Sequence, residues 1–246
     1  MRYWLNSPDK KVDPEEFDRR SAAVCQTYAA APELHRQGTH TVSTDEKTGM
    51  QALERAAATL PMKPGLIERQ EADYIRHGTQ VLTANFEVAT GKLICPTIGD
   101  TRNEQDFADH VARTVASDPH APWVFVVDQL NTHQSEALVR LVATLCGITS
   151  CLGVKGKSGI LESMPSRRAF LEDRSHRIHF VYTPRHASWL NQVEIWFSIL
   201  ARRVLKRGSF TSTANLREKL LAFIEYFNNT MAKAFRWTYQ GKPLTV

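Results

Sequence analysis

The chain has 246 residues, of which 42% are hydrophobic and 23% are charged, and its formal net charge at pH 7 is +5. This composition is typical of a globular protein that folds as one good-sized domain around a sizeable core. The apolar runs are too short to cross a membrane, which excludes a membrane-spanning protein. The sequence starts without a signal peptide and its four cysteines form no CxxC pair, so we expect a cytoplasmic protein with reduced thiols.

The charge is distributed unevenly along the chain. Residues 151–246 contain 16 lysines and arginines against 6 aspartates and glutamates, whereas residues 1–150 contain 15 against 20. A strongly basic half is the electrostatic footprint expected for a partner that carries many phosphates. An ordinary solvated surface can have the same composition. Charge alone therefore does not decide whether the chain binds nucleic acid.

The first residues predict a helical lead-in. Asp13 and Glu16 flank a proline in a typical helix start, with a capping carboxylate and a glutamate three residues later. Apolar residues then recur at helical spacing until about Ala31, a stretch too short for a helix-turn-helix domain. We therefore divide the chain into a helical lead-in or linker at residues 1–38 and a main domain at residues 39–246.

The main domain predicts strands interspersed with helices. A β-branched run predicts a first strand that ends near Asp45, and a later apolar run predicts a central strand buried on both faces. The strands are predicted at residues 39–46, 80–88, 92–100, 123–130 and 177–184, with the second and third forming a hairpin. The helices are predicted at residues 103–116, 135–146 and 211–229, and one more begins near Glu194. This order fits an α/β fold with a mixed five-stranded sheet and flanking helices.

Two further segments of the main domain have their own character. Residues 148–175 separate a predicted helix from the last strand, and the Gly/Ser/Lys-rich part at 152–168 predicts an irregular loop. We interpret this segment as an insertion, which a fold tolerates because the entropy of loop closure grows slowly with length. Residues 211–246 are expected to form a C-terminal helix and tail.

Three acidic residues occupy suggestive positions in this pattern. Asp45 and Asp128 lie at the predicted ends of strands, and Glu194 begins an amphipathic, otherwise basic helix. Taken singly, each has a common structural interpretation, as a turn or cap residue or as a solvated ion-pair partner. Taken together, they predict a site for divalent metal ions held against a nucleic-acid phosphate, because Mg²⁺ prefers oxygen ligands and needs few of them.

The blocks around these residues resemble a known family. The strings TDEKTG (44–49), YIRHGTQVLTANFEVATGK (74–92), VVDQLNTHQSE (126–136) and HASWLNQVEIWFSIL (186–200) are similar to the catalytic domain of mariner-like DDE transposases of bacterial insertion sequences. The W-L-N-x-x-E block is highly specific, and the resemblance runs from about Thr39 to the C-terminus. It implies a ribonuclease-H-like fold whose metal-binding and catalytic triad falls on Asp45, Asp128 and Glu194.

The resemblance also implies a reaction and its partners. The family cuts double-stranded DNA at transposon ends with Mg²⁺ or Mn²⁺ and joins the freed 3′-OH to target DNA. We therefore expect two metal ions, with Asp45 bridging both, and a homodimer in the active complex. The location implied is the bacterial cytoplasm, in association with the nucleoid.

The chain departs from the family pattern in three places. Gln129 follows the second aspartate, where many relatives have asparagine, and 65 residues separate Asp128 from Glu194, more than is usual. Relatives also carry an N-terminal helix-turn-helix region that is not recognisable here, which suggests an isolated catalytic domain or a truncated transposase. Two other interpretations stay open: a ribonuclease-H-like nuclease for RNA–DNA hybrids or structured DNA, and a decayed, non-catalytic remnant that binds DNA.

Further residues are candidates for the neighbourhood of the site. His133 either orients a water or phosphate or merely begins a helix, and Asn131 and Asn191 are expected near the carboxylates. Basic residues are candidates for contacts with DNA phosphates. These are Arg76, Lys155, Lys157, Arg202, Arg203, Lys206 and Arg207.

Overall fold

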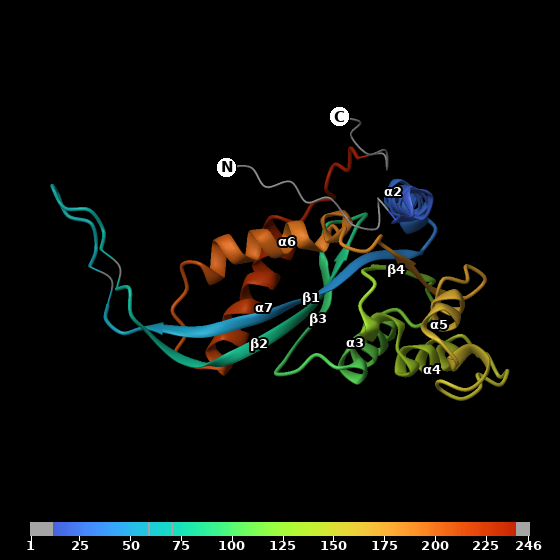
Figure 1. Ribbon diagram of the computed structural model, residues 1–246. Coiled ribbons are helices and arrows are strands. Elements are labelled where there is room, and N and C mark those ends of the chain that lie inside the picture. Colours follow the sequence, from blue (N-terminus) through green and yellow to red (C-terminus); the bar gives the residue numbers. More distant parts are fainter. Residues whose placement is uncertain (1–11, 59, 70, 240–246) are drawn as a thin grey trace.

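A computed structural model describes residues 12–58, 60–69 and 71–239 (Figure 1). Its helices are α2 (Pro14–Arg36), α3 (Glu104–Ala116), α4 (Glu136–Leu145), α5 (Met164–Leu171), α6 (Val193–Leu200) and α7 (Thr213–Thr230). Its strands are β1 (His40–Arg55), β2 (Tyr74–Glu87), β3 (Leu93–Gly99), β4 (Trp123–Val127) and β5 (Ile178–Tyr182). In this part of the chain no helix is both long and apolar enough to span a membrane.

The strands form one mixed five-stranded sheet in the order β3-β2-β1-β4-β5. The first three strands are antiparallel, whereas β4 and β5 run parallel to β1. Every residue of β4 is buried, as the uninterrupted apolar run predicts for a central strand covered on both faces. The predicted α/β fold with flanking helices is therefore confirmed.

Helices cover both faces of the sheet (Figure 1). On one face, α3, α4 and α5 pack over Val42, Phe125 and Phe180. On the other face, α2 packs over Val124 and Val126, while α6 and α7 cover the β1–β2 half of the sheet. The alternation of side chains along each strand thus buries apolar residues on both faces, in one cluster beneath α3–α5 and two on the opposite face.

Strand β1 continues well beyond the predicted end near Asp45. It pairs with β4 only as far as Ser43, but with β2 until Arg55 pairs with Tyr74. A β-bulge between Lys47 and Met50 interrupts the alternation, so the polar, glycine-containing stretch that resembles a turn is a bulge within a long strand. The prediction was wrong here because β2 supplies hydrogen bonds that local composition does not reveal. Together β1 and β2 leave the sheet as a two-stranded ribbon (Figure 1).

The lead-in helix is longer than predicted and packs closely on the main domain. Asp13 caps it by accepting a hydrogen bond from the Glu16 backbone, as predicted, but the helix continues past Ala31 to Arg36. Its buried Tyr28 donates a hydrogen bond to the Leu190 carbonyl at 2.9 Å. This helix therefore forms part of the folded unit.

Residues 148–175 were expected to contain an irregular loop, and this expectation was wrong for their second half. A short 3₁₀ turn at Gly159–Leu161 leads into α5, whose start is closed by a capping box at Ser163. Leu161 and Leu171 are fully buried in the core beneath α4. Glycine and serine give the stretch a loop-like composition, but two widely spaced leucines anchor it, and such spacing gives no periodic signal.

We predict that Leu161→Ala lowers the free energy of unfolding by about 2–5 kcal/mol, because it removes a fully buried side chain and leaves a cavity. Denaturant-induced unfolding measures the change. Val154→Ala in the same segment is the control, since Val154 is 53% exposed and its truncation should change stability little. Equal effects of the two substitutions would contradict the packing of this segment into the core.

Candidate active site

Asp45 and Asp128 are brought level by the pairing of their strands. Ser43 of β1 lies opposite Val126 of β4 in the parallel register. Two residues further on, Asp45 continues β1 and Asp128 directly follows β4, so both lie at the same height on strands spaced about 4.8 Å apart. Asp128 also accepts a hydrogen bond from the Leu130 backbone at 2.9 Å, which turns the chain away from the sheet.

Asn191 attaches the start of α6 to this point of β1. Its buried amide nitrogen donates to the Thr44 carbonyl at 2.9 Å and to Asp45 Oδ2 at 3.3 Å. Ser43 Oγ donates to the Asn191 Oδ1 and accepts from the Val193 backbone nitrogen at 2.9 Å. Glu194, the second residue of α6, is thereby held over the face of β1 that carries Asp45.

The helix that carries Glu194 has the predicted orientation. Val193, Trp196, Phe197 and Leu200 are buried against the sheet, whereas Glu194 lies at the edge of the buried stripe and is partly exposed. Helical periodicity in the sequence was sufficient to predict this orientation. Asn191 belongs to the turn before the helix.

Asp128 is close enough to influence both Asp45 and Glu194. Burial, followed by the charge of Asp128, raises the pKa of Asp45 to about 7. Burial also raises the pKa of Glu194, with a further upward contribution from Asp128 and an opposing one from Lys47. Crowded, partly desolvated carboxylates disfavour their own ionisation, and a bound cation relieves this cost.

His133 is the partner of the second aspartate. This fully buried side chain lies in the 3₁₀ turn Asn131–Gln134 that precedes α4. Its Nδ1 lies 2.7 Å from Asp128 Oδ1 and its Nε2 lies 3.2 Å from Glu46 Oε2. Burial lowers its pKa, but the bonds to Asp128 and Glu46 outweigh burial and raise it to about 10.

The pKa of Asp128 is lowered as a result of this contact. Burial acts to raise it, but the hydrogen bond and positive charge of His133 prevail. Glu46 completes the arrangement and was not among the predicted residues. Its position directly after Asp45 in a strand places it on the opposite face, toward α3, and that alternation was the available signal.

The remaining predicted residues do not all converge on the carboxylates. Exposed Asn131 lines a surface hollow together with Asp128, Arg185 and His186, and the last two were missed as lining residues. Gln129 is anchored to the scaffold by hydrogen bonds to the Thr183 carbonyl and from Arg168.

The basic candidates lie at several places. Arg76 pairs with Leu53 on the ribbon, eight residues along β1 from Asp45 and so about 26 Å away. Lys155 lies 3.6 Å from Glu104, near α3, and Lys157 is exposed in the same segment. The four remaining candidates follow α6 and are exposed. Arg202 and Arg203 lie in the π-helical turn Ala201–Leu205, and Lys206 and Arg207 lie in the turn after it.

We predict that His133→Ala lowers the free energy of unfolding by about 3–5 kcal/mol, because it leaves buried Glu46 and the adjoining Asp128 without their partner. Thermal or denaturant unfolding gives the change. His77→Ala is the matched control, since His77 forms a 2.7 Å pair with Glu54 that is partly exposed and should contribute about 0–1 kcal/mol. A loss for His133→Ala no larger than that for His77→Ala would argue against a buried, compensated charge.

Comparisons with known proteins agree with this geometry. Residues 40–217 match the family model described as DDE superfamily endonuclease. No curated protein sequence matches the chain. Among solved structures, the chain is similar to the Mos1 mariner paired-end complex with Mn, with a TM-score of 0.53 and 14% identity over 92% of this chain and 59% of that one.

Two other structures lead to the same fold. The Mos1 transposase paired-end complex with left transposon end has a TM-score of 0.51 and 13% identity, over 92% of this chain and 58% of that one. The catalytic domain of Mos1 mariner transposase has a TM-score of 0.50 and 11% identity, over 92% and 85%. The chain thus spans about three fifths of the longer Mos1 chains. Its fold is that of the ribonuclease-H-like Mos1 catalytic domain, and the chain belongs to the DDE superfamily endonucleases.

Proposed function

We propose that the chain is the catalytic domain of a transposase, which cuts DNA strands at transposon ends and transfers the freed 3′-OH to target DNA. The observation that supports this proposal is the strand register that places Asp45 beside Asp128, together with Asn191, which attaches the start of the Glu194 helix to Asp45. The domain comprises residues 39–246, with α2 packed against it. The membership of the DDE superfamily endonucleases supports the reaction class.

The residues present fit divalent cations of the Mg²⁺ or Mn²⁺ type. The three carboxylates offer the hard oxygen ligands that these ions prefer. The raised pKa of Asp45 and of Glu194 reflects negative charge that such ions would compensate. Two of the similar Mos1 structures were solved with Mn, which supports the same choice.

We assign the carboxylates to two ions. Asp45, Asp128 and Glu194 would together hold them. When bound, such ions would activate the attacking oxygen and stabilise the leaving oxygen and the phosphate charge. The reaction is in-line attack on phosphorus, first by water and then by the freed 3′-OH.

The chain's own groups orient the ligands. His133 holds Asp128 through its Nδ1 and is itself held by Glu46, which leaves the other carboxylate oxygen of Asp128 to face the site. Asn191 performs the same task for Asp45 with a neutral amide, so it adds no charge that would compete with a cation. Ligands positioned in this way lose little freedom when the substrate binds.

We propose that the chain binds DNA through four basic residues that follow α6. Arg202, Arg203, Lys206 and Arg207 begin two helical turns after Glu194, about 12 Å along the helix, and lie outside the core. Phosphate contacts at this distance would position the duplex over the carboxylates. Paired-end complexes are known for Mos1 transposase, and we propose that a homodimer likewise forms the active complex here.

We predict that Asp45→Asn, Asp128→Asn and Glu194→Gln each reduce metal-dependent strand cleavage by at least about 10³-fold, because each removes a charged ligand worth several kcal/mol. The assay follows nicking of DNA that carries the element's own ends, in Mg²⁺ or Mn²⁺. Glu225→Gln on α7 is the control with the same chemical change at an exposed position and should retain full activity. If each of the three single variants still cleaves DNA at the rate of the unmodified chain, the assignment of these residues as the catalytic carboxylates is refuted. Two further assays separate a transposase from a hybrid nuclease: joining of DNA ends and cleavage of RNA–DNA hybrids. A transposase joins ends, whereas a hybrid nuclease cleaves hybrids and joins nothing.

We predict that the double substitution of Arg202 and Arg203 by alanine weakens DNA binding and makes it less sensitive to salt. The slope of log K against log salt concentration should fall by about 0.9 for each phosphate that the variant no longer neutralises. DNA-binding titrations at several salt concentrations provide the slope. They are done in Ca²⁺ or in other conditions in which the DNA is not cleaved. The control is a double substitution of Arg19 and Arg36, which are exposed on α2 and ion-paired with Glu16 and Glu33. Because both variants lose two charges, an equal change in slope would show that only net charge matters.

A further inference from the structure

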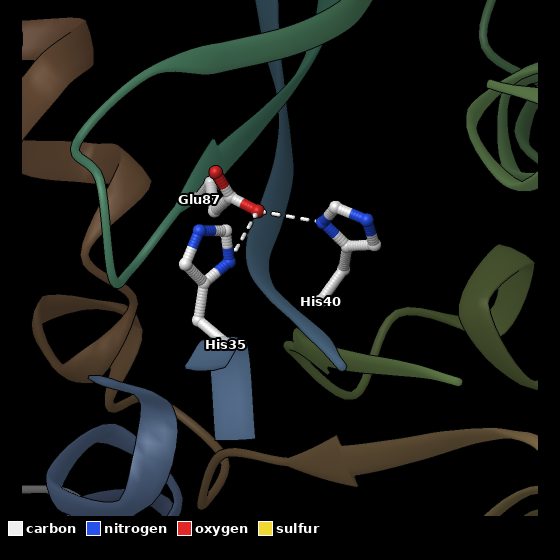
Figure 2. A group of neighbouring side chains, drawn as sticks. All are labelled: His35, His40 and Glu87. Carbon is white, nitrogen blue, oxygen red and sulfur yellow. Dashed lines mark hydrogen bonds and ion pairs between the residues drawn. The ribbon is translucent and has the colours of Figure 1, made fainter. Parts of the chain in front are cut away.

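A second cluster of side chains that can bind metal ions lies where the chain passes from α2 into the sheet (Figure 2). His35 is in the last turn of α2, His40 begins β1, and Glu87 ends β2. Glu87 Oε1 lies 2.7 Å from His40 Nδ1 and 3.5 Å from His35 Nδ1. In the described part of the chain, this is the one group of three such side chains whose ligand atoms all lie within 4.8 Å of one another.

The backbone that forms this cluster is tightly specified. Gly38 adopts a φ of +83°, and the Thr39 nitrogen donates to the Leu34 carbonyl at 2.9 Å, so the chain reverses between the two histidines. The Val88 nitrogen donates to the Thr41 carbonyl at 2.9 Å, which fixes the end of β2 beside the start of β1. The three side chains are therefore presented by three different elements of a rigid junction.

Groups outside the cluster orient its members. His40 Nε2 lies 3.3 Å from Asp118 Oδ2, and its ring stacks on Trp123 at 4.2 Å between centroids. Thr90 Oγ1 donates to the second oxygen of Glu87 at 2.6 Å. Histidine ligands of metals commonly donate their other ring N–H to a carboxylate, as His40 would to Asp118.

One tautomer of His40 leaves room for a cation between His40 and Glu87. If His40 Nε2–H donates to Asp118, then Nδ1 directs a lone pair at Glu87 Oε1 2.7 Å away. Two acceptors at that separation repel unless a proton or a cation lies between them. In the other tautomer the proton on Nδ1 fills that place, and a metal ion at the cluster would replace this proton.

We propose that His35, His40 and Glu87 form a binding site for a Zn²⁺-type transition-metal ion, separate from the catalytic carboxylates. Two imidazoles and one carboxylate suit Zn²⁺, with the fourth position left to water. Tetrahedral bonds of about 2.0–2.1 Å place ligand atoms roughly 3.3 Å apart. The His35–Glu87 distance of 3.5 Å is close to this value, and the His40–Glu87 distance must widen by about half an ångström.

The location defines what the ion would do. His40 lies five residues before Asp45 on the same strand, about 16 Å away, so the ion cannot belong to the catalytic pair. It would instead join the C-terminal end of α2 to the first residue of β1 and the last of β2. Glu87 is buried, whereas the side chain of His35 is 39% exposed and leaves a route from solvent.

The test is a titration of the untagged full chain with Zn²⁺, and in parallel with Co²⁺, in an excess of Mg²⁺ that occupies oxygen-ligand sites. We expect one equivalent of Zn²⁺ by calorimetry, a visible absorption band typical of four-coordinate Co²⁺, and a higher midpoint of thermal unfolding with Zn²⁺. His35→Ala and Glu87→Gln should each abolish all three signals. Asp118→Asn, which leaves the ligands in place, should weaken the affinity by about 10–100-fold.

The controls separate this site from other causes of binding. His77→Ala removes a histidine from the His77–Glu54 pair, outside the cluster, and should leave the equivalent of Zn²⁺ unchanged. Glu194→Gln should also leave it unchanged, because the catalytic carboxylates are a separate site. Circular dichroism checks that His35→Ala, a change at a part-exposed position, remains folded. Absence of Zn²⁺ binding by the unmodified chain, or binding that His35→Ala leaves intact, would overturn the proposal and leave a protonated histidine–carboxylate pair.

Discussion

The parallel pairing of β1 with β4 is the constraint on which the site depends. The register that places Ser43 opposite Val126 also places Asp45 level with Asp128. A slip of one residue would turn Asp45 toward α3 and bring Glu46 to the site in its place. Asn191 fixes the start of α6 to the same part of β1, because its side chain donates hydrogen bonds to both the Thr44 carbonyl and the Asp45 carboxylate. One register thus determines the positions of two strand residues and one helix.

The fold compensates its buried negative charges in two different ways. Asp128 and Glu46 share the imidazole of His133, so their charge is balanced inside the protein. Asp45 receives a hydrogen bond from the neutral Asn191 side chain, and burial leaves its pKa raised. Burial likewise raises the pKa of Glu194, which Lys47 offsets only in part. Ionisation is therefore less favourable at Asp45 and Glu194 than at Asp128.

Helix α2 connects distant parts of the described chain to the sheet. Its Tyr28 contacts Trp237 at 5.1 Å between ring centroids, and its Arg20 bonds to Glu172 at 2.8 Å. The proposed metal cluster lies at the C-terminal end of this same helix. A segment that resembles a linker in sequence is therefore anchored along its length, which couples its position to that of the strand carrying Asp45.

The sequence by itself indicated the helices other than α5 and the buried central strand, because helical periodicity and long apolar runs are local signals. The three acidic residues were singled out by the motifs that contain them. Only the tertiary structure decided where β1 ends, since its outer half depends on pairing with β2 across the chain. The same holds for Glu46 and His133, which lie 87 residues apart and meet only once β4 has paired with β1. It also holds for residues 159–171, whose two buried leucines are too far apart in sequence to form a pattern. Contacts between distant segments carry no local signature, so the sequence named His133 and Asn191 as candidates near the carboxylates but did not show which carboxylate each one contacts.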